Sequence, residues 1–188
     1  MKGLPRLSLN ILVKMFYLVE QILSVKECKR IFKKPKAWQP GWLQENNRVY
    51  RNDRIAWLPN DNQLWLSLRQ HMTATRTAPM DFILPKFLIS WYSVGSSYDW
   101  HSDKIANNGI SVTARTCIIA LSASVGTVIE TQQGLFSLDK GQGIQIPSTD
   151  SYAIYGPPRT HNSYNNDQYF LFAWGAQRLS DKLFVKNF

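Results

Sequence analysis

Two stretches in the first half of the chain carry apolar residues at the three- and four-residue spacing of a helix. The first predicted helix covers residues 24–34, where Ser24 and Glu27 form a capping-box pattern and Pro35 ends the helix. The second covers residues 60–72, with Asn60 or Asp61 as its N-cap. The apolar positions are Val25, Cys28, Ile31 and Phe32 in the first helix and Leu64, Leu68 and Met72 in the second.

From residue 87 onward the pattern changes to short runs rich in β-branched and aromatic residues, separated by Gly, Asn, Asp and Pro. The runs cover residues 87–94, 116–124, 126–132, 134–139, 143–148, 151–156 and 169–176. This order of elements, with helices first and strands afterwards, predicts a mainly β protein of the α+β class. We expect a β-sandwich or barrel with the helices packed on its outside. We expect one domain over residues 1–188, with an N-terminal arm at 1–19 and the β core at 87–176.

The positive charge is concentrated at the N-terminus. The net charge is +9, but residues 1–40 hold nine Lys and Arg against two Asp and Glu, and the rest is nearly balanced. This segment forms a solvated basic helix or attracts an acidic peptide, a phosphate or a membrane surface. Lys14 and Glu20 interrupt the first apolar run, so neither a membrane span nor a signal peptide is expected. Cys28 and Cys117 lack a CxxC partner, which favours a reducing, cytoplasmic location.

A His-x-Asp pair, His101 and Asp103, is the strongest chemical signal in a chain that has only three histidines. Alternation along a strand places these two side chains on one face. His161 follows sixty residues later at the end of a predicted strand, which could bring it across the barrel mouth. Two histidines and one carboxylate form the ligand set of non-heme Fe(II) oxygenases, which leaves metal positions open. The alternative is a histidine that is simply hydrogen-bonded to a nearby aspartate.

The segment "WYSVGSSYDWHSD" resembles the signature of prolyl-4-hydroxylase-like Fe(II)/2-oxoglutarate dioxygenases. In that family a strand with a tyrosine leads through a glycine and a second tyrosine into His-x-Asp. The resemblance extends in order over roughly residues 20–176, from the opening helix to the closing strand "YFLFAWGA". The matching positions are Tyr92, Gly95, Tyr98, His101 and Asp103.

The resemblance implies a double-stranded β-helix in which His101, Asp103 and His161 hold Fe(II). 2-Oxoglutarate would be the co-substrate and O2 the oxidant, with ascorbate as a supporting reductant. The expected reaction couples decarboxylation of 2-oxoglutarate to hydroxylation of a C–H bond. The substrate would be a peptide or protein side chain or an amino-acid-like metabolite, and the basic N-terminal segment favours an acidic one.

One position departs from the family pattern. The family places Arg or Lys at the start of the closing strand, where it pairs with the far carboxylate of 2-oxoglutarate. Counting from His161 puts Phe170 or Leu171 there, whereas aligning by Trp174 puts Gln168 there. Gln168 would hydrogen-bond the carboxylate without an ion pair. Further candidate donors are Tyr92 and Thr116, and other basic residues that could reach in are Lys104, Arg115, Arg159 and Arg178.

The departure leaves three options: an unusual anchor, a different oxo acid, or lost activity. Because all three predicted metal ligands are present, an enzyme is favoured over a non-catalytic, cupin-like binding module. Demethylation of nucleic acid is a third interpretation, against which the near-neutral charge of residues 41–188 argues, and no nucleic acid is expected as a partner. Consumption of 2-oxoglutarate in the presence of Fe(II) separates the enzyme from the binder.

Overall fold

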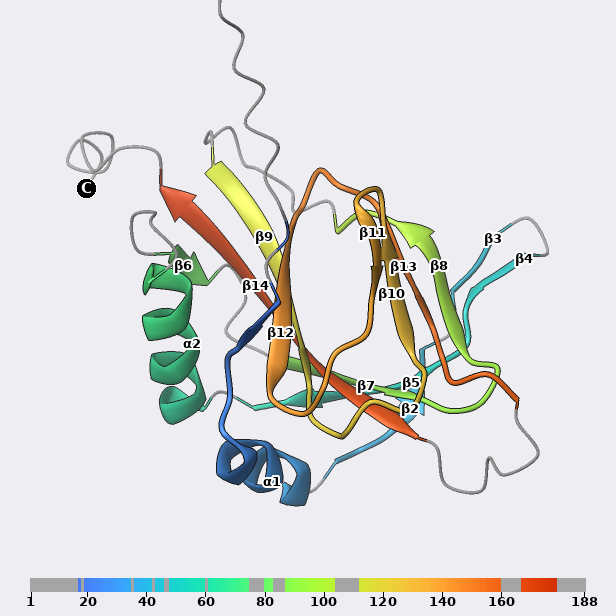
Figure 1. Cartoon of the computed structure of the whole chain (residues 1–188), viewed down its shortest axis with the longest axis horizontal. Helices are drawn as coiled ribbons and strands as arrows, with labels where there is room; N and C mark the ends of the chain where they lie inside the picture. Colours follow the sequence, from blue (N-terminus) through green and yellow to red (C-terminus); the bar gives the residue numbers. More distant parts are fainter. Residues whose placement is uncertain are drawn as a thin grey trace, which may run out of the picture.

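Two antiparallel sheets face each other in the computed structural model (Figure 1). The structure describes residues 17, 19–34, 36–41, 43–45, 48–59, 61–74, 80–82, 87–103, 112–159 and 167–178. In order, the larger sheet contains β1 (Val19–Gln21), β12 (Gln142–Pro147), β9 (Val112–Ala120), β14 (Gln168–Arg178), β7 (Phe87–Tyr92), β5 (Arg54–Leu58) and β2 (Gln39–Pro40), with β6 (Met80–Phe82) beside β14. The smaller sheet contains β11 (Gly134–Phe136), β10 (Val128–Thr131), β13 (Tyr152–Tyr155), β8 (Ser97–His101), β4 (Arg48–Arg51) and β3 (Leu43–Glu45).

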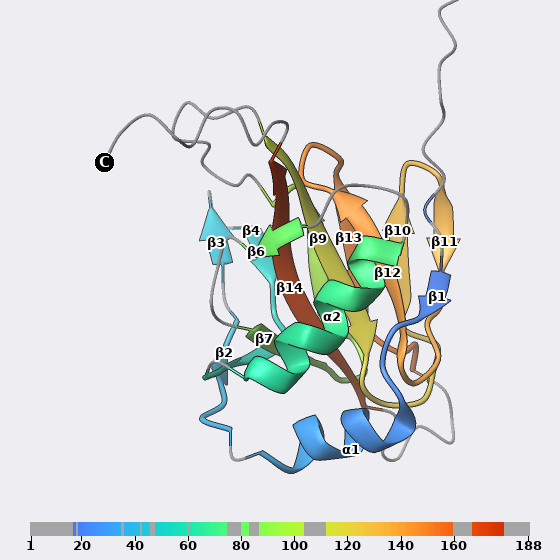
Figure 2. The ribbon, with the colours of Figure 1, turned by 90° about the vertical axis from the view of Figure 1, so that its left-hand side faces the viewer.

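The two predicted helices are present and cover the outer face of the larger sheet (Figures 1 and 2). Helix α1 (Val25–Lys33) begins with the predicted capping box, because Ser24 Oγ accepts from the Glu27 amide while the Glu27 carboxylate accepts from the Ser24 amide. Helix α2 spans Asn62–Ala74. The mainly β core with helices outside it is therefore confirmed.

The expectation that helices come first and strands afterwards is wrong for the first half of the chain. Strands β1 to β6 precede residue 87, and four of them, β2 to β5, lie between the two helices. These strands are short, and they lie toward or at the edges of the two sheets, so they have little need for the continuous apolar runs that mark central strands.

Alternation along the central strands divides the apolar side chains into two layers. On β14, Phe170 and Phe172 point between the sheets, while Leu171 and Ala173 point toward the helices. The inner layer also receives side chains from β12 and β13, and the outer layer is closed by α1 and α2. The inside of the barrel is therefore walled by both sheets, and any polar side chain that points inward is enclosed. Neither described helix is long and apolar enough to span a membrane.

Asp61 ties the start of α2 to α1. Its Oδ1 accepts from the amides of Gln63 and Leu64 at 3.0 and 3.1 Å, which caps the helix. Its Oδ2 lies 2.8 Å from Arg30 Nη1 and 2.6 Å from Lys34 Nζ. Burial favours the protonated acid, but Lys34, the Leu64 amide and Arg30 outweigh it and lower the pKa of Asp61 to about 2.

We expect Asp61→Asn to lower the free energy of unfolding by about 2 kcal/mol near neutral pH, because the amide can still cap the helix but forms no ion pairs. A carboxylate with a lowered pKa stabilises the fold above its unfolded pKa, and this contribution disappears as the pH falls through about 2. Urea unfolding of both proteins from neutral to acidic pH should therefore show a difference that shrinks toward low pH. A difference that is independent of pH would contradict this role, and Asp139→Asn, at an exposed position, is the control.

Candidate metal centre

His101 is held at the end of β8 by an irregular pairing with β13. Tyr152 lies opposite His101, but Ile154 lies opposite Tyr98, so β8 contains one more residue than its partner over this interval. Such a bulge changes the alternation, which allows Tyr98 and His101 to share one face although they are three residues apart. Their rings stack with centroids 3.5 Å apart and an angle of 13°. The imidazole is therefore fixed against an aromatic surface.

The protonation of His101 follows from its contacts. Its Nδ1 lies 2.7 Å from the carbonyl oxygen of Asp99, and since a carbonyl can only accept, Nδ1 carries the proton. Burial lowers the pKa of His101 below its usual value, although the Asp99 carbonyl and Asp103 oppose this effect. The neutral ring therefore presents an unprotonated Nε2. This atom is buried and has no hydrogen-bond partner among the described residues.

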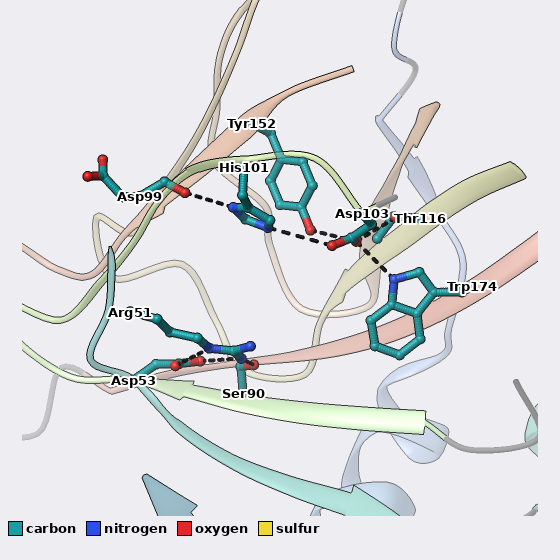
Figure 3. A network of polar contacts seen from close by, with 9 residues as sticks. All are labelled: Arg51, Asp53, Ser90, Asp99, His101, Asp103, Thr116, Tyr152 and Trp174. Carbon is teal, nitrogen blue, oxygen red and sulfur yellow. Dashed lines mark hydrogen bonds and ion pairs between the residues drawn. The ribbon is translucent and has the colours of Figure 1, made fainter. Parts of the chain in front are cut away.

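Asp103 is oriented by three donors from three strands (Figure 3). Its Oδ2 accepts from Thr116 Oγ1 at 2.7 Å, from Tyr152 Oη at 2.9 Å and from Trp174 Nε1 at 2.9 Å. The other oxygen, Oδ1, lies 3.7 Å from His101 Nε2, which is too long for a hydrogen bond. Two electron-rich atoms therefore face each other with no proton between them. This arrangement fits a cation bound by both residues.

The third predicted ligand cannot be placed beside this pair, because His161 lies outside the described residues and its role stays a prediction. Among the described residues, no further histidine, cysteine, aspartate or glutamate joins His101 and Asp103. The described chain does bring Tyr152 to Asp103. Tyr152 could not be selected from the sequence, since only the pairing of β13 with β8 shows its position.

The residues predicted to hold 2-oxoglutarate all point into the barrel, at different depths. Thr116 lies opposite Trp174, at the end of the barrel that holds Asp103, and its hydroxyl donates to Asp103. Gln168 precedes Trp174 by six residues along β14, roughly 20 Å in an extended strand, so it lies deep in the barrel. Its Nε2 donates to the Leu138 carbonyl at 3.0 Å, and its Oε1 is buried without a partner among the described residues. Tyr92 pairs with Gln168 across the strands, and its buried hydroxyl also lacks a partner in the described part of the chain.

The basic residues considered as alternatives to Gln168 do not supply an anchor in the described structure. Thr116 points inward and its neighbour Arg115 consequently points away, while Arg159 is exposed. Lys104 and the side chain of Arg178 lie outside the described residues. The inward-facing arginine is instead Arg51, which the sequence pattern did not indicate.

Arg51 forms a buried ion pair inside the barrel (Figure 3). Its Nε and Nη2 donate to the two oxygens of Asp53 at 2.5 and 2.9 Å, and Nη2 also donates to Ser90 Oγ at 3.0 Å. The guanidinium lies 4.4 Å from the ring centre of Tyr98, the residue that stacks on His101. Arg-x-Asp has the same two-residue spacing as His-x-Asp. That spacing is the signal in the sequence, but Asp53 lies between β4 and β5, so the spacing alone does not show that both side chains point inward.

Comparisons with known proteins give the fold. No protein-family model matches the sequence, and no curated protein matches it. Among solved structures, the viral collagen prolyl hydroxylase of Paramecium bursaria Chlorella virus-1, in a complex with 2-oxoglutarate, has a TM-score of 0.60 at 14% identity and covers 87% of this chain and 97% of its own. A Pseudomonas putida prolyl-4-hydroxylase has a TM-score of 0.51 at 14% identity, covering 86% of this chain and 92% of its own.

A third similar structure is HygX from Streptomyces hygroscopicus, with nickel and 2-oxoglutarate bound. Its TM-score is 0.54 at 10% identity, and the match covers 87% of this chain and 83% of that one. At these identities the likeness establishes the fold and not the activity. The chain thus has the double-stranded β-helix fold of 2-oxoglutarate–Fe(II) oxygenases of known structure.

Proposed function

We propose that this protein is an Fe(II)/2-oxoglutarate-dependent oxygenase. One observation carries the proposal: His101 Nε2 and Asp103 Oδ1, two acceptors, face each other at 3.7 Å, and Nε2 is buried without a hydrogen-bond partner among the described residues. Without a cation this geometry is unfavourable, and an imidazole together with a carboxylate suits a divalent transition metal. The fold supports the choice of iron and 2-oxoglutarate, since similar structures contain 2-oxoglutarate or a metal with it.

Within this function the residues around the pair have separate roles. His101 and Asp103 would hold Fe(II), with His161 as the third ligand predicted from the sequence. The Asp99 carbonyl fixes the imidazole tautomer, and Thr116 and Trp174 orient the carboxylate, which is how outer partners support metal ligands. When bound, Fe(II) with 2-oxoglutarate and O2 supplies the oxidation of a C–H bond.

The deep end of the barrel would receive the far carboxylate of 2-oxoglutarate through hydrogen bonds. The Tyr92 hydroxyl is a buried donor without a partner among the described residues, and Gln168 lies opposite it. Among the described inward-facing residues, Arg51 carries a positive charge, but this charge is already paired with Asp53. It is therefore not free to pair with the carboxylate of 2-oxoglutarate. We therefore expect 2-oxoglutarate to bind less tightly than in a site with a free arginine, by the difference between a hydrogen bond and a charge-assisted pair.

The lack of an unpaired arginine among the described inward-facing residues favours a second candidate, a metal-binding barrel without turnover. If hydrogen bonds at Tyr92 and Gln168 hold an oxo acid too weakly, the His101–Asp103 pair would still bind a metal. The two candidates share the metal centre and differ only in whether 2-oxoglutarate is consumed.

For the substrate we propose a peptide or protein side chain or an amino-acid-like metabolite. The exposed basic residues Lys26, Lys29 and Lys33 lie on α1. Helix α1 packs near Ala120 at the far end of β9 from Thr116, away from the end of β8 that carries His101 (Figure 1). An acidic partner attracted by α1 would therefore dock away from the metal centre and present a more distant segment to it.

The test measures metal binding and turnover in the same preparation. We expect the wild-type chain to bind Mn(II), observed by loss of the free-ion electron paramagnetic resonance signal. With Fe(II), ascorbate and O2 it should convert 2-oxoglutarate to succinate above a metal-free control. Mn(II) binding without succinate formation would support the binding module, and no Mn(II) binding would refute both candidates.

A further inference from the structure

Strand β13, which pairs with β8, places a tyrosine beside His101 and Asp103. In the antiparallel pairing of β13 with β8, Tyr152 is directly opposite His101. Directly opposite residues in such a pair have neighbouring side chains, and the ring centres of His101 and Tyr152 are 4.3 Å apart. Tyr152 is almost completely buried and points into the barrel.

The hydroxyl of Tyr152 is the part that reaches the centre. Tyr152 Oη lies 2.9 Å from Asp103 Oδ2 (Figure 3). Two oxygens bound at a right angle to one ion, with bonds of about 2.1 Å, are separated by about 3.0 Å. Tyr152 Oη and the Asp103 carboxylate are thus already at the spacing that two ligands of one ion have, so binding of Oη to an ion held by Asp103 Oδ1 and His101 Nε2 needs little movement of Tyr152.

The chain after Tyr152 runs away from His101. Tyr155 pairs with Ser97 at the other end of β8, and the next residue, Gly156, donates its amide to the Ser96 carbonyl at 2.7 Å. The carbonyl of Pro157 accepts from the Gly95 amide at 3.4 Å. The described part of this connection thus follows β8 toward its beginning, whereas His101 is at its end.

We propose that Tyr152 is the third protein ligand of the metal centre, so that the ligand set is His101, Asp103 and Tyr152. The inference rests on the proposed function for the presence of a metal. Binding breaks the O–H bond of Tyr152, whose proton leaves to solvent, and forms a bond from the phenolate oxygen to the metal; no electrons are transferred. A tyrosinate is an established iron ligand in proteins.

This ligand set has chemical consequences that a second histidine would not have. One imidazole and two anionic oxygens neutralise more positive charge than two imidazoles and one carboxylate. Anionic oxygen donors favour hard ions, so the site should hold Fe(III) tightly relative to Fe(II). Thr116 and Trp174 would continue to hold Asp103 after the Tyr152 proton is lost.

The experiment uses Fe(III), supplied as its nitrilotriacetate complex, as the probe. A phenolate bound to Fe(III) gives a visible charge-transfer band and tyrosinate vibrations in the resonance Raman spectrum, which imidazole and carboxylate do not give. We expect both signals in the wild-type protein and neither in Tyr152→Phe. This variant keeps the ring that packs on His101, and it should bind Mn(II) at least about tenfold more weakly, since loss of a mere outer partner typically costs that much.

The control is Tyr155→Phe on the same strand, where the side chain is exposed and opposite Ser97; both signals should persist. His161→Ala decides between the two candidate ligands. A greater loss of Mn(II) affinity in His161→Ala than in Tyr152→Phe would overturn the proposal, and so would Fe(III) binding by the wild type without tyrosinate vibrations. The Raman measurement on the wild type needs no variant, so it tests the proposal even if Tyr152→Phe misfolds.

The result also separates this inference from the proposed function. Binding of Mn(II) and turnover of 2-oxoglutarate without tyrosinate signals would leave the oxygenase standing and remove Tyr152 alone. Absence of any metal binding by the wild type would remove both.

Discussion

Replacing Asp103 by Asn should abolish metal binding and 2-oxoglutarate turnover without destabilising the fold. The amide has the shape of the carboxylate, and its oxygen can still accept from Thr116, Tyr152 and Trp174. Its NH2 group would then face Nε2 of His101, where the native protein has two acceptors 3.7 Å apart, and a shift of a few tenths of an ångström would let it donate to Nε2. We expect turnover to fall by more than about 100-fold, since outer partners of metal ligands alone account for about 10–100-fold.

The expected stability change distinguishes this centre from an ordinary His–Asp contact. If the pair served only to stabilise the fold, removing the charge of Asp103 would lower the melting temperature. If the pair exists to hold a cation, the metal-free variant gains a hydrogen bond and should melt at the same temperature as the metal-free wild type or above it. Calorimetry of both proteins after treatment with a chelator measures this difference.

Two further variants should weaken metal binding by smaller amounts than Asp103→Asn. Thr116→Val and Trp174→Phe each remove one donor to Asp103 Oδ2 while leaving the carboxylate in place. Each should weaken Mn(II) binding by about 10–100-fold, less than Asp103→Asn does. Asp139→Asn, at an exposed carboxylate, is the control for loss of a negative charge. Retention of Mn(II) affinity in Asp103→Asn would show that the metal, if any, binds elsewhere.

The sequence predicted those parts of the fold that depend on local patterns. The predicted capping box of Ser24 and Glu27 starts α1, and alternation along β9 places Thr116, Ile118 and Ala120 inward. His101 and Asp103 lie together, although β8 ends at His101 and Asp103 follows in the next segment. These features are determined by neighbours within a few residues of each other along the chain.

The parts that the sequence did not reveal depend on long-range pairing. The bulge that brings Tyr98 onto the face of His101 exists only in the register of β8 with β13, and the same register places Tyr152. Strand β4 was missed because its inward residue is Arg51, a charge where a buried strand normally shows an apolar residue. Arg51 becomes recognisable as an inward residue only once Asp53 and Ser90 are seen to surround it.

This buried pair connects the stability of the barrel to the metal centre. Arg51 and Asp53 have 10% and 0% of their side-chain surface exposed, so both charges depend on each other. Burial by itself would lower the pKa of Arg51, but the hydrogen bonds and charge of Asp53 raise it above its usual value. The guanidinium lies against Tyr98, and Tyr98 lies against His101, so the pair supports the surface on which the imidazole rests.

Replacing Asp53 by Ala should strongly destabilise the fold. The change leaves the Arg51 guanidinium buried without its carboxylate, and breaking a buried ion pair in this way typically costs about 3–5 kcal/mol. Gly41 adds to the constraint, because a Cβ at that position would lie 2.2 Å from Asp53 Oδ1, so the loop fits closely around the pair. Urea denaturation followed by tryptophan fluorescence would measure the change.

The double variant Arg51→Met/Asp53→Ala tests the cause. If the loss arises from an unpaired charge, removing both charges should restore much of the stability, because a buried pair replaced by apolar groups is often neutral. Arg54→Ala is the matched control: that arginine is exposed beside Trp91, and its loss should cost no more than about 1 kcal/mol. Even where the double variant folds well, Tyr98 lacks its cation, so Mn(II) affinity should stay below that of the wild type. Full recovery of both stability and Mn(II) affinity would show that Arg51 plays no part in positioning His101.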